Sequence, residues 1–279
     1  MLTQLIYYLP KNLLSRIAGW LAERKFPSFM LKTFIKWYVG QYKVEMNDAE
    51  KGIDEFTTFN EFFTRALKPG KRPIDQSEQS VVSPVDGVLL SMNEIENGSL
   101  LQVKNIHYLL SDLIGEKKSP LYEGGVQLTI YLSPSDYHRI HVPIDSKLET
   151  YSYFSGNLWP VNNIFANRLG GLFSLNERIY SHFQAENSFY GMVKVGAMIV
   201  GKIAVKYTDV TTNNKFMSVT DQPPNEPFSL TKGGEVGHFC LGSTVILLFP
   251  KGFVNISDSL KLGQKLQMGE VIGSINDVG

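Results

Sequence analysis

The stretch GHFCLGSTVILLFP, residues 237–250, places a Gly-Ser step directly before a long apolar run. The run from Val245 to Phe249 has the length and composition of a strand buried inside a sheet. Gly242 carries no side chain to obstruct attack by the Ser243 hydroxyl on the preceding carbonyl, and it tolerates unusual dihedral angles. The pattern therefore has two interpretations: a turn that enters a strand, or a chain that cuts itself between Gly242 and Ser243.

From about Val81 onward, short runs rich in Val, Ile, Leu and Tyr alternate with Gly, Pro, Asn and Asp. Short strands between turns predict a mainly antiparallel β core. The Gly-punctuated stretch LKLGQKLQMGEVIGSI (260–275) is analogous to carrier-like folds of barrel-sandwich character. We therefore expect an α+β protein with an N-terminal amphipathic helical segment. The predicted strands are 81–90, 126–132, 148–154, 191–205, 245–249 and 271–275.

The first 45 residues predict two helices with basic and aromatic character. Pro10 suits the first turn of one helix, and Ser28 could cap the next. Seven basic residues and one acid occur in the first 43 positions, together with Trp20 and Trp37, as is typical of helices that lie in a membrane interface. Helices that pack on the core fit the same spacing. The segment shows no membrane-spanning stretch and no signal-peptide cleavage pattern.

Length and composition limit the number of domains and the classes of partner. The chain has 279 residues, of which 43% are hydrophobic and 19% charged, and its net charge is zero. This is enough for one substantial core, and nothing in the charge indicates a nucleic-acid partner. The single Cys240 excludes an internal disulfide framework and fits a reducing compartment. We expect a helical segment at 1–45 and one domain at 46–279.

Three more polar residues are candidates for chemistry. His138 and His141 lie where the chain is expected to pass from a turn into a strand, so they need not share a face and can have different roles. Structural histidines are the alternative. Two histidines at this spacing occur in zinc sites, but no Cys pair or nearby Glu completes a ligand set. Asp86 could make an ordinary turn hydrogen bond. Together with a histidine and Ser243, it would complete a nucleophile, a base and an orienting acid.

Several segments in a fixed order resemble the phosphatidylserine decarboxylases, specifically the bacterial pyruvoyl-dependent proenzymes. The segments are TFNEFFTRAL (58–67) with RPID (72–75), SPVDGV (83–88), YLSPSDYHRIHVP (131–143) and LGST (241–244). The resemblance extends across nearly the whole chain. It implies self-cleavage between Gly242 and Ser243 into chains 1–242 and 243–279, with Ser243 converted into a covalent pyruvoyl group.

The resemblance also implies roles for individual residues. Asp86, His141 and Ser243 match the family's self-cleavage triad, in which Asp86 orients His141 and His141 takes the Ser243 proton. His138 matches the histidine that acts in decarboxylation, as the proton donor. The pyruvoyl ketone is expected to form a Schiff base with phosphatidylserine and to accept the electrons released as CO2 leaves, which gives phosphatidylethanolamine.

The expected partners follow from this resemblance and from the helices. They are the lipid substrate, a membrane surface bound through the N-terminal helices, the two cleavage chains held together as a heterodimer, and a second copy in a homodimer. No nucleic acid or metal is expected. We expect a peripheral protein on the cytoplasmic face of a bacterial inner membrane.

Two other functions remain open from the sequence. One is a membrane-surface serine hydrolase or acyltransferase that uses Ser243 without cleavage, although the chain lacks the Gly-x-Ser-x-Gly elbow there. The other is a non-catalytic membrane adaptor. His238 and Cys240 could supply a competing base and a reactive thiol, or they could be packing residues. Trp159, in NLWPVN (157–162), is a candidate pocket-rim residue or an ordinary loop residue.

Overall fold

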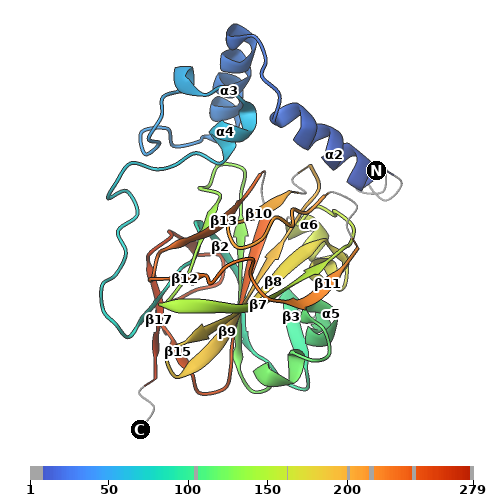
Figure 1. Cartoon of the computed structure of the whole chain (residues 1–279), viewed down its shortest axis with the longest axis vertical. Coiled ribbons are helices and arrows are strands. Elements are labelled where there is room, and N and C mark those ends of the chain that lie inside the picture. The colour runs from blue at the N-terminus through green and yellow to red at the C-terminus, as the bar shows by residue number, and fades with distance from the viewer. Residues whose placement is uncertain are drawn as a thin grey trace.

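The computed structural model describes residues 9–103, 106–161, 163–199, 202–213, 217–240 and 243–276. Figure 1 shows α2, α3 and α4 gathered at one end of the molecule, with the strands filling the rest. The α-helices are α2 (Lys11–Ala22), α3 (Ser28–Tyr42), α4 (Phe59–Phe63), α5 (Leu110–Ile114), α6 (Asn163–Ala166) and α7 (Leu172–Leu175), and the 3-10 helices are η1 (Ile53–Glu55) and η2 (Ser119–Tyr122).

Most of the strands belong to one large antiparallel sheet of nine strands, in which β14 is central, with β9 on one side and β5 on the other. The strands are β1 (Ser80–Val82), β2 (Gly87–Glu94), β3 (Ser99–Val103), β4 (Ile106–Leu109), β5 (Val126–Leu132), β6 (Arg139–His141), β7 (Ser146–Phe154), β8 (Arg178–Ala185), β9 (Ser188–Val195), β10 (Ile203–Val205), β11 (Val219–Gln222), β12 (Ser229–Leu230), β13 (Glu235–Phe239), β14 (Ser243–Phe249), β15 (Val254–Ile256), β16 (Lys265–Leu266) and β17 (Val271–Ile275).

The large sheet separates two hydrophobic cores. One core packs it against two three-stranded sheets, β10-β13-β6 and β1-β17-β15, and the other packs its opposite face against α5, α6 and α7. Val245 and Leu247 of β14 point into the first core, while Ile246 and Leu248 point into the second. Burial on both faces is why this strand is apolar at every position from Val245 to Phe249 instead of alternating with polar residues.

The predicted fold class is confirmed: the protein is α+β, its strand pairs are antiparallel, and helices precede the sheets. The described strands form open sheets and no closed barrel, so the carrier-like analogy extends only to the pattern of short strands and turns. Two predicted strands are each divided in two. The turn at 83–86 separates β1 from β2, and 196–202 lie between β9 and β10.

A third hydrophobic cluster joins the helices to one another. It contains Ile35 and Tyr38 of α3 and Phe59, Phe62 and Phe63 of α4. Helix α4 has an N-cap at Thr58, whose Oγ1 accepts a hydrogen bond from the Glu61 backbone N–H at 3.0 Å. Ser28, by contrast, is the first residue of α3 and makes no capping hydrogen bond there. The cluster includes residues on both sides of position 45, and the division at that position stays a prediction.

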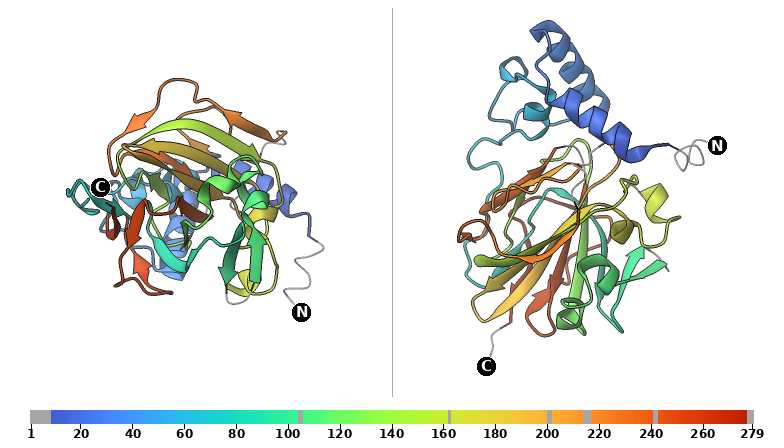
Figure 2. Two further views of the ribbon diagram at one scale, coloured as in Figure 1. Left: turned by 90° about the horizontal axis from the view of Figure 1, so that it is seen from below. Right: turned by 45° about the vertical axis from the view of Figure 1, so that its right-hand side comes forward.

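Helix α2 turns its polar side toward the protein. Asn12 donates to the Gly156 carbonyl at 2.9 Å, and Ser15 accepts from the backbone N–H of Ile199 at 2.9 Å. Leu13 and Ile17 are about half exposed. The right-hand view in Figure 2 shows α2 and α3 projecting from the sheets. Among the described residues, no helix is long and apolar enough to cross a membrane.

Candidate active site

Ser243 is the first residue of β14, which is a central strand of the large sheet. It lies opposite Leu132 of β5 in the register of the two strands. The side chain is fully buried, and its Oγ has no hydrogen-bond partner among the described residues. A buried hydroxyl without a partner is destabilising, so its presence requires an explanation. Leu241 and Gly242 lie outside the described residues, so the predicted cleavage bond is described from its serine side only.

The histidines lie beside the strand that precedes Ser243: the backbone N–H of Phe239 donates to the His138 carbonyl at 3.0 Å, and His141 pairs with Glu235. Strand β5 ends at Leu132, the register partner of Ser243, and a turn follows in which Asp136 accepts hydrogen bonds from the backbone N–H and hydroxyl of Ser133, each at 2.7 Å. The chain then enters β6, which pairs with β13, the strand just before Ser243. His138 thus pairs four residues before Ser243 and His141 eight residues before it, and among the described residues no hydrogen bond joins either ring to Ser243.

His138 is completely buried at the end of this turn. Its Nδ1 lies 2.8 Å from the carbonyl oxygen of Asp136. A carbonyl only accepts, so Nδ1 carries the proton and Nε2 carries the lone pair. That Nε2 has no partner among the described residues, and the ring lies 4.1 Å from that of Phe63, measured between centroids. Burial, followed by the charge of Arg65, lowers the pKa of His138 to about 3. The ring is thus a neutral base.

His141 has a different environment at the end of β6. Its Nδ1 donates to the Gly233 carbonyl at 2.7 Å, and its Nε2 accepts from the Tyr137 hydroxyl at 3.1 Å. Burial lowers the pKa of His141 as well. The two histidines thus have separate partners, as separate roles require. Tyr137 occupies the lone pair that a base would use.

Asp86 is buried in the turn before β2, and its carboxylate is fully engaged. Arg72 donates from Nε to Oδ1 at 2.8 Å and from Nη2 to Oδ2 at 2.5 Å, and the backbone N–H of Met268 donates to Oδ1 at 2.8 Å. Among the described residues, no hydrogen bond joins Asp86 to His141. The link between them is through the backbone, because the N–H of His141 donates to the Pro84 carbonyl at 2.9 Å.

The structure thus adds two residues to those predicted from the sequence. Arg72, which holds Asp86, lies in the RPID segment that carries the family resemblance, so a signal for it was present. Tyr137, which holds His141, precedes His138 in the HRIH segment. A tyrosine at that position is also compatible with simple packing, and its role becomes visible only through its contact with His141.

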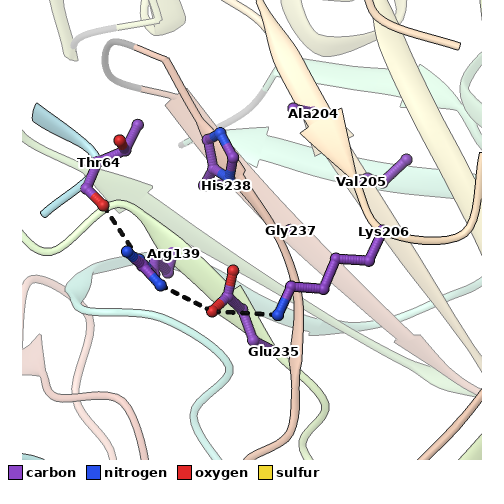
Figure 3. Close-up of a pocket in the computed structure, with 8 residues that line it drawn as sticks. All are labelled: Thr64, Arg139, Ala204, Val205, Lys206, Glu235, Gly237 and His238. Atoms are coloured by element: carbon purple, nitrogen blue, oxygen red, sulfur yellow. Dashed lines mark hydrogen bonds and ion pairs between the residues drawn. The ribbon is translucent and has the colours of Figure 1, made fainter. Parts of the chain in front are cut away.

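In the part of the chain that the structure describes, no side-chain hydrogen bond joins His238 or Cys240, just before the predicted cleavage site, to the two candidate histidines. Figure 3 shows His238 lining a shallow pocket of about 180 Å³ beside the ion pairs of Glu235 with Arg139 and Lys206. Burial raises the pKa of Cys240 to about 11, which keeps the thiol protonated. Trp159 packs against Lys11 and Phe165, and its role as a pocket rim stays a prediction. Among the described residues, no group of three or more His, Cys, Asp or Glu side chains could hold a metal ion.

A much larger apolar groove lies between the helices and the histidine turn. Its volume is about 710 Å³, and its lining includes Phe34 and Tyr38 of α3, Phe59 and Phe63 of α4, and Pro134. Phe63 also contacts the ring of His138, and the Tyr38 hydroxyl donates to the Pro134 carbonyl at 3.2 Å. The floor of the groove is therefore in contact with the candidate active site.

Comparison with known proteins agrees with this arrangement. The sequence model of the family described as "Phosphatidylserine decarboxylase" matches residues 59–274, and a second family model, described as "PSD", matches residues 2–43. The chain is similar to phosphatidylserine decarboxylase proenzymes of Shewanella amazonensis (40% identical over 97% of each chain), Shewanella baltica (39% over 98% of this chain and 96% of the relative) and Myxococcus xanthus (38% over 98% of this chain and 97% of the relative).

Proposed function

Because this chain belongs to the phosphatidylserine decarboxylase family, we propose that it cuts itself between Gly242 and Ser243 and then decarboxylates phosphatidylserine. The observation that carries the proposal is the state of Ser243. Its hydroxyl is buried at the start of a central strand with no partner among the described residues, and the strand that precedes it pairs with the segment that carries two buried histidines. A hydroxyl that attacks its own peptide bond must not be held in place by another hydrogen bond.

The cleavage chemistry uses groups of this chain and one water molecule. The Ser243 Oγ attacks the Gly242 carbonyl carbon while a base takes the hydroxyl proton. That proton passes to the peptide nitrogen, which leaves as an amine, so the amide becomes an ester. Loss of the Ser243 α-proton then expels the Gly242 carboxylate and leaves dehydroalanine. Water finally releases the nitrogen as ammonia, and a ketone remains at the new N-terminus.

His141 is the proposed base, as the family resemblance implies. Its Nε2 lone pair accepts from Tyr137, so proton transfer from Ser243 to His141 either passes through the Tyr137 hydroxyl or displaces it. The Gly233 carbonyl accepts from Nδ1 of His141 and so orients the ring. The family resemblance implies this orienting role for the Asp86 carboxylate. Asp86 contributes by fixing, together with Arg72, the turn whose Pro84 carbonyl anchors the backbone of His141.

The two cleavage products should stay together. Segment 243–279 contains β14, which pairs with β9 and β5, and also β16 and β17, which pair with β2 and β1. Removing this segment would open the centre of the large sheet and expose both cores. We therefore expect a heterodimer of 1–242 and 243–279 after cleavage.

The residues around position 243 fit a pyruvoyl group. A pyruvoyl ketone takes up a primary amine and accepts the electron pair released when CO2 leaves. The buried setting of Ser243 keeps bulk water away from such a ketone. The Nε2 of His138 is an unpartnered, neutral base, so it can take a proton from the substrate ammonium and return it to carbon afterwards. The family resemblance implies that His138 is a proton donor. In this scheme, it must first accept a proton.

The helices support a position at a membrane surface. Large apolar side chains are exposed on α2, α3 and the link between them, including Trp20 (55%), Phe29 (73%) and Trp37 (57%). Amphipathic helices with exposed aromatic residues bind to the membrane interface. The apolar groove beside Phe63 could receive the acyl chains of a lipid whose head group reaches His138. A homodimer, and a location on the cytoplasmic face of the inner membrane, are the parts of the proposal that rest on family resemblance.

Intact mass of the purified protein tests this function. We expect two fragments, one of which begins at position 243 with a blocked N-terminus that reacts with hydroxylamine or borohydride. Ser243→Ala should remain uncut and inactive. Thr244→Ala is the matched control, because Thr244 is the next buried residue of β14 and its Oγ1 also lacks a partner among the described residues. Full activity from an uncut chain would instead favour a serine hydrolase.

A further inference from the structure

Arg65, just after α4, is a buried cation with unused hydrogen-bonding capacity. Its Nη2 donates to the carbonyl oxygens of Ser135 at 3.1 Å and Asp136 at 3.4 Å. Its Nε and Nη1 are buried and have no partner among the described residues, and no ion pair with a described carboxylate satisfies it. The side chain is about 95% buried, since only 5% of the residue is exposed. A buried guanidinium in this condition is destabilising unless something else binds it.

Arg178 shows that this fold can satisfy a buried arginine completely. It is equally buried, and its Nε, Nη1 and Nη2 all donate to backbone carbonyls, those of Leu113, Ser174, Asn176 and Asp112. The unused groups of Arg65 are therefore a local feature and not a general consequence of burying this side chain. An unpaired guanidinium fork is suited to bidentate contact with a phosphate or a carboxylate.

The carboxylates nearest to Arg65 are already engaged. Asp86 binds Arg72 and the backbone of Met268. Asp136 accepts from Ser133 and forms an ion pair with Lys265 at 3.3 Å. Both acids favour the charged form of Arg65 from a distance without contacting it. Arg65 thus lacks a contacting anion within the described residues.

The location of Arg65 indicates which anion would bind. Arg65 and His138 share one acceptor, the carbonyl oxygen of Asp136. On the other side, the guanidinium lies over the ring of Phe62 at 5.7 Å, and the neighbouring Phe63 lines the apolar groove. Arg65 therefore lies close to His138, and Phe62 and Phe63 of α4 connect it to the groove.

We propose that Arg65 binds the phosphodiester of the lipid substrate. This inference rests on the proposed function and adds the residue that selects a phospholipid over free serine. In a diacyl phospholipid the phosphodiester joins the acyl chains to the head group. With the acyl chains in the groove and the head group at His138, the phosphodiester must lie near Phe63, which lines the groove and contacts His138, and Arg65 is two residues further along the chain. The substrate carboxylate is a poorer candidate, because a cation holding it would stabilise the ground state and oppose loss of CO2.

Kinetics of Arg65→Gln and Arg65→Lys test the proposal, with Arg178→Lys as the control for disturbing a buried arginine. Each variant is first checked by intact mass for self-cleavage, which reports on folding and processing. The KM for micellar short-chain phosphatidylserine and the inhibition constant of phosphatidylethanolamine are then measured. The product keeps the phosphodiester and lacks the carboxylate, so it separates the two anions. Inorganic phosphate serves as a second competitor, to distinguish the lipid from a free anion.

We expect Arg65→Gln to be cleaved and to show a roughly ten- to hundredfold rise in both KM and the phosphatidylethanolamine inhibition constant, with kcat changed less. Arg65→Lys should recover part of the loss, and Arg178→Lys should lower Tm without moving KM.

Unchanged inhibition by phosphatidylethanolamine with a raised KM would assign Arg65 to the carboxylate instead. Unchanged KM in a cleaved, active Arg65→Gln, or equal effects in Arg178→Lys, would overturn the proposal while leaving the decarboxylase function intact. If Arg65→Gln stays uncut, the same measurements on Arg65→Lys test the proposal. Inhibition by inorganic phosphate as strong as that by the lipid product would refute selection of the phospholipid.

Discussion

Arg72 and Asp86 form a two-point ion pair in which the guanidinium contacts both carboxylate oxygens. The pair joins the segment that follows the helices to the turn that opens β2. Asp86 has no direct bond to His141 among the described residues, and the hydrogen bond that joins its turn to His141 is the one from the His141 N–H to the Pro84 carbonyl. The carboxylate that the sequence assigns to a triad is thus also a structural element of the turn.

Asp86→Asn should lower the free energy of unfolding and also slow self-cleavage. The change leaves Arg72 charged with a poorer partner, and breaking a buried pair costs about 3–5 kcal/mol. Asp48→Asn is the control, because Asp48 also contacts Arg72, at 3.1 Å, but is more exposed, and exposed pairs contribute about 0–1 kcal/mol. Urea unfolding in the uncut Ser243→Ala background measures the loss of stability for each substitution, and the disappearance of full-length chain in the Ser243 protein measures self-cleavage. Equal losses for the two substitutions would refute the structural role of Asp86.

The two histidines should separate the two reactions. We expect His141→Ala to remain uncut, because the proposed base for Ser243 is lost. His138→Ala should be cut and then decarboxylate about 10²- to 10⁴-fold more slowly, the usual contribution of a positioned acid or base. Intact mass scores the first reaction and CO2 release scores the second. If His138→Ala blocked cleavage and His141→Ala did not, the assignment would have to be reversed.

Tyr137→Phe probes the hydrogen bond that the sequence did not reveal. Removing the hydroxyl frees Nε2 of His141, the lone pair that accepts the serine proton in the proposed scheme. If the hydroxyl is displaced during cleavage, the variant should cut faster than the wild type. If the hydroxyl relays the proton, the variant should cut more slowly. The rate at which full-length chain disappears after synthesis distinguishes the two, and an unchanged rate would remove Tyr137 from the reaction.

Local patterns predicted much of the fold and less of the site. The apolar run at 245–249 predicted a buried strand because burial on both faces forbids polar residues. The spacing in α2 predicted a helix but not its orientation, since Asn12 and Ser15 bind carbonyl and amide groups far along the chain. Motifs located Asp86 and the histidines. The RPID motif contains Arg72, but no local pattern records its contact with Asp86, and Gly233, the partner of His141, lies 92 residues further along the chain.

Substitutions on α3 should distinguish membrane binding from core packing. Phe29→Ser and Trp37→Ser remove exposed apolar side chains, and each should weaken binding to anionic liposomes about tenfold or more while leaving Tm unchanged. Ile35→Ser is the contrasting variant, because Ile35 is fully buried in the helical cluster and its loss should lower Tm. Liposome sedimentation and thermal unfolding give the two readouts. Unchanged sedimentation of both surface variants would contradict the membrane role of these helices.

Stability should fall with acid partly because of His138. Its pKa is about 3 in the folded chain and about 6.5 when unfolded, so between these values the unfolded state binds more protons. The free energy of unfolding therefore rises with pH across this window and falls as pH drops from about 6.5 toward 3. In the Ser243→Ala background, His138→Gln should reduce the slope of the free energy of unfolding against pH by about 1.4 kcal/mol per pH unit, which is the contribution of one proton. Burial also lowers the pKa of His182, to about 4, so some slope should persist in the variant. Urea titrations at a series of pH values measure the difference, and parallel curves for the two proteins would show that His138 is protonated in the folded state.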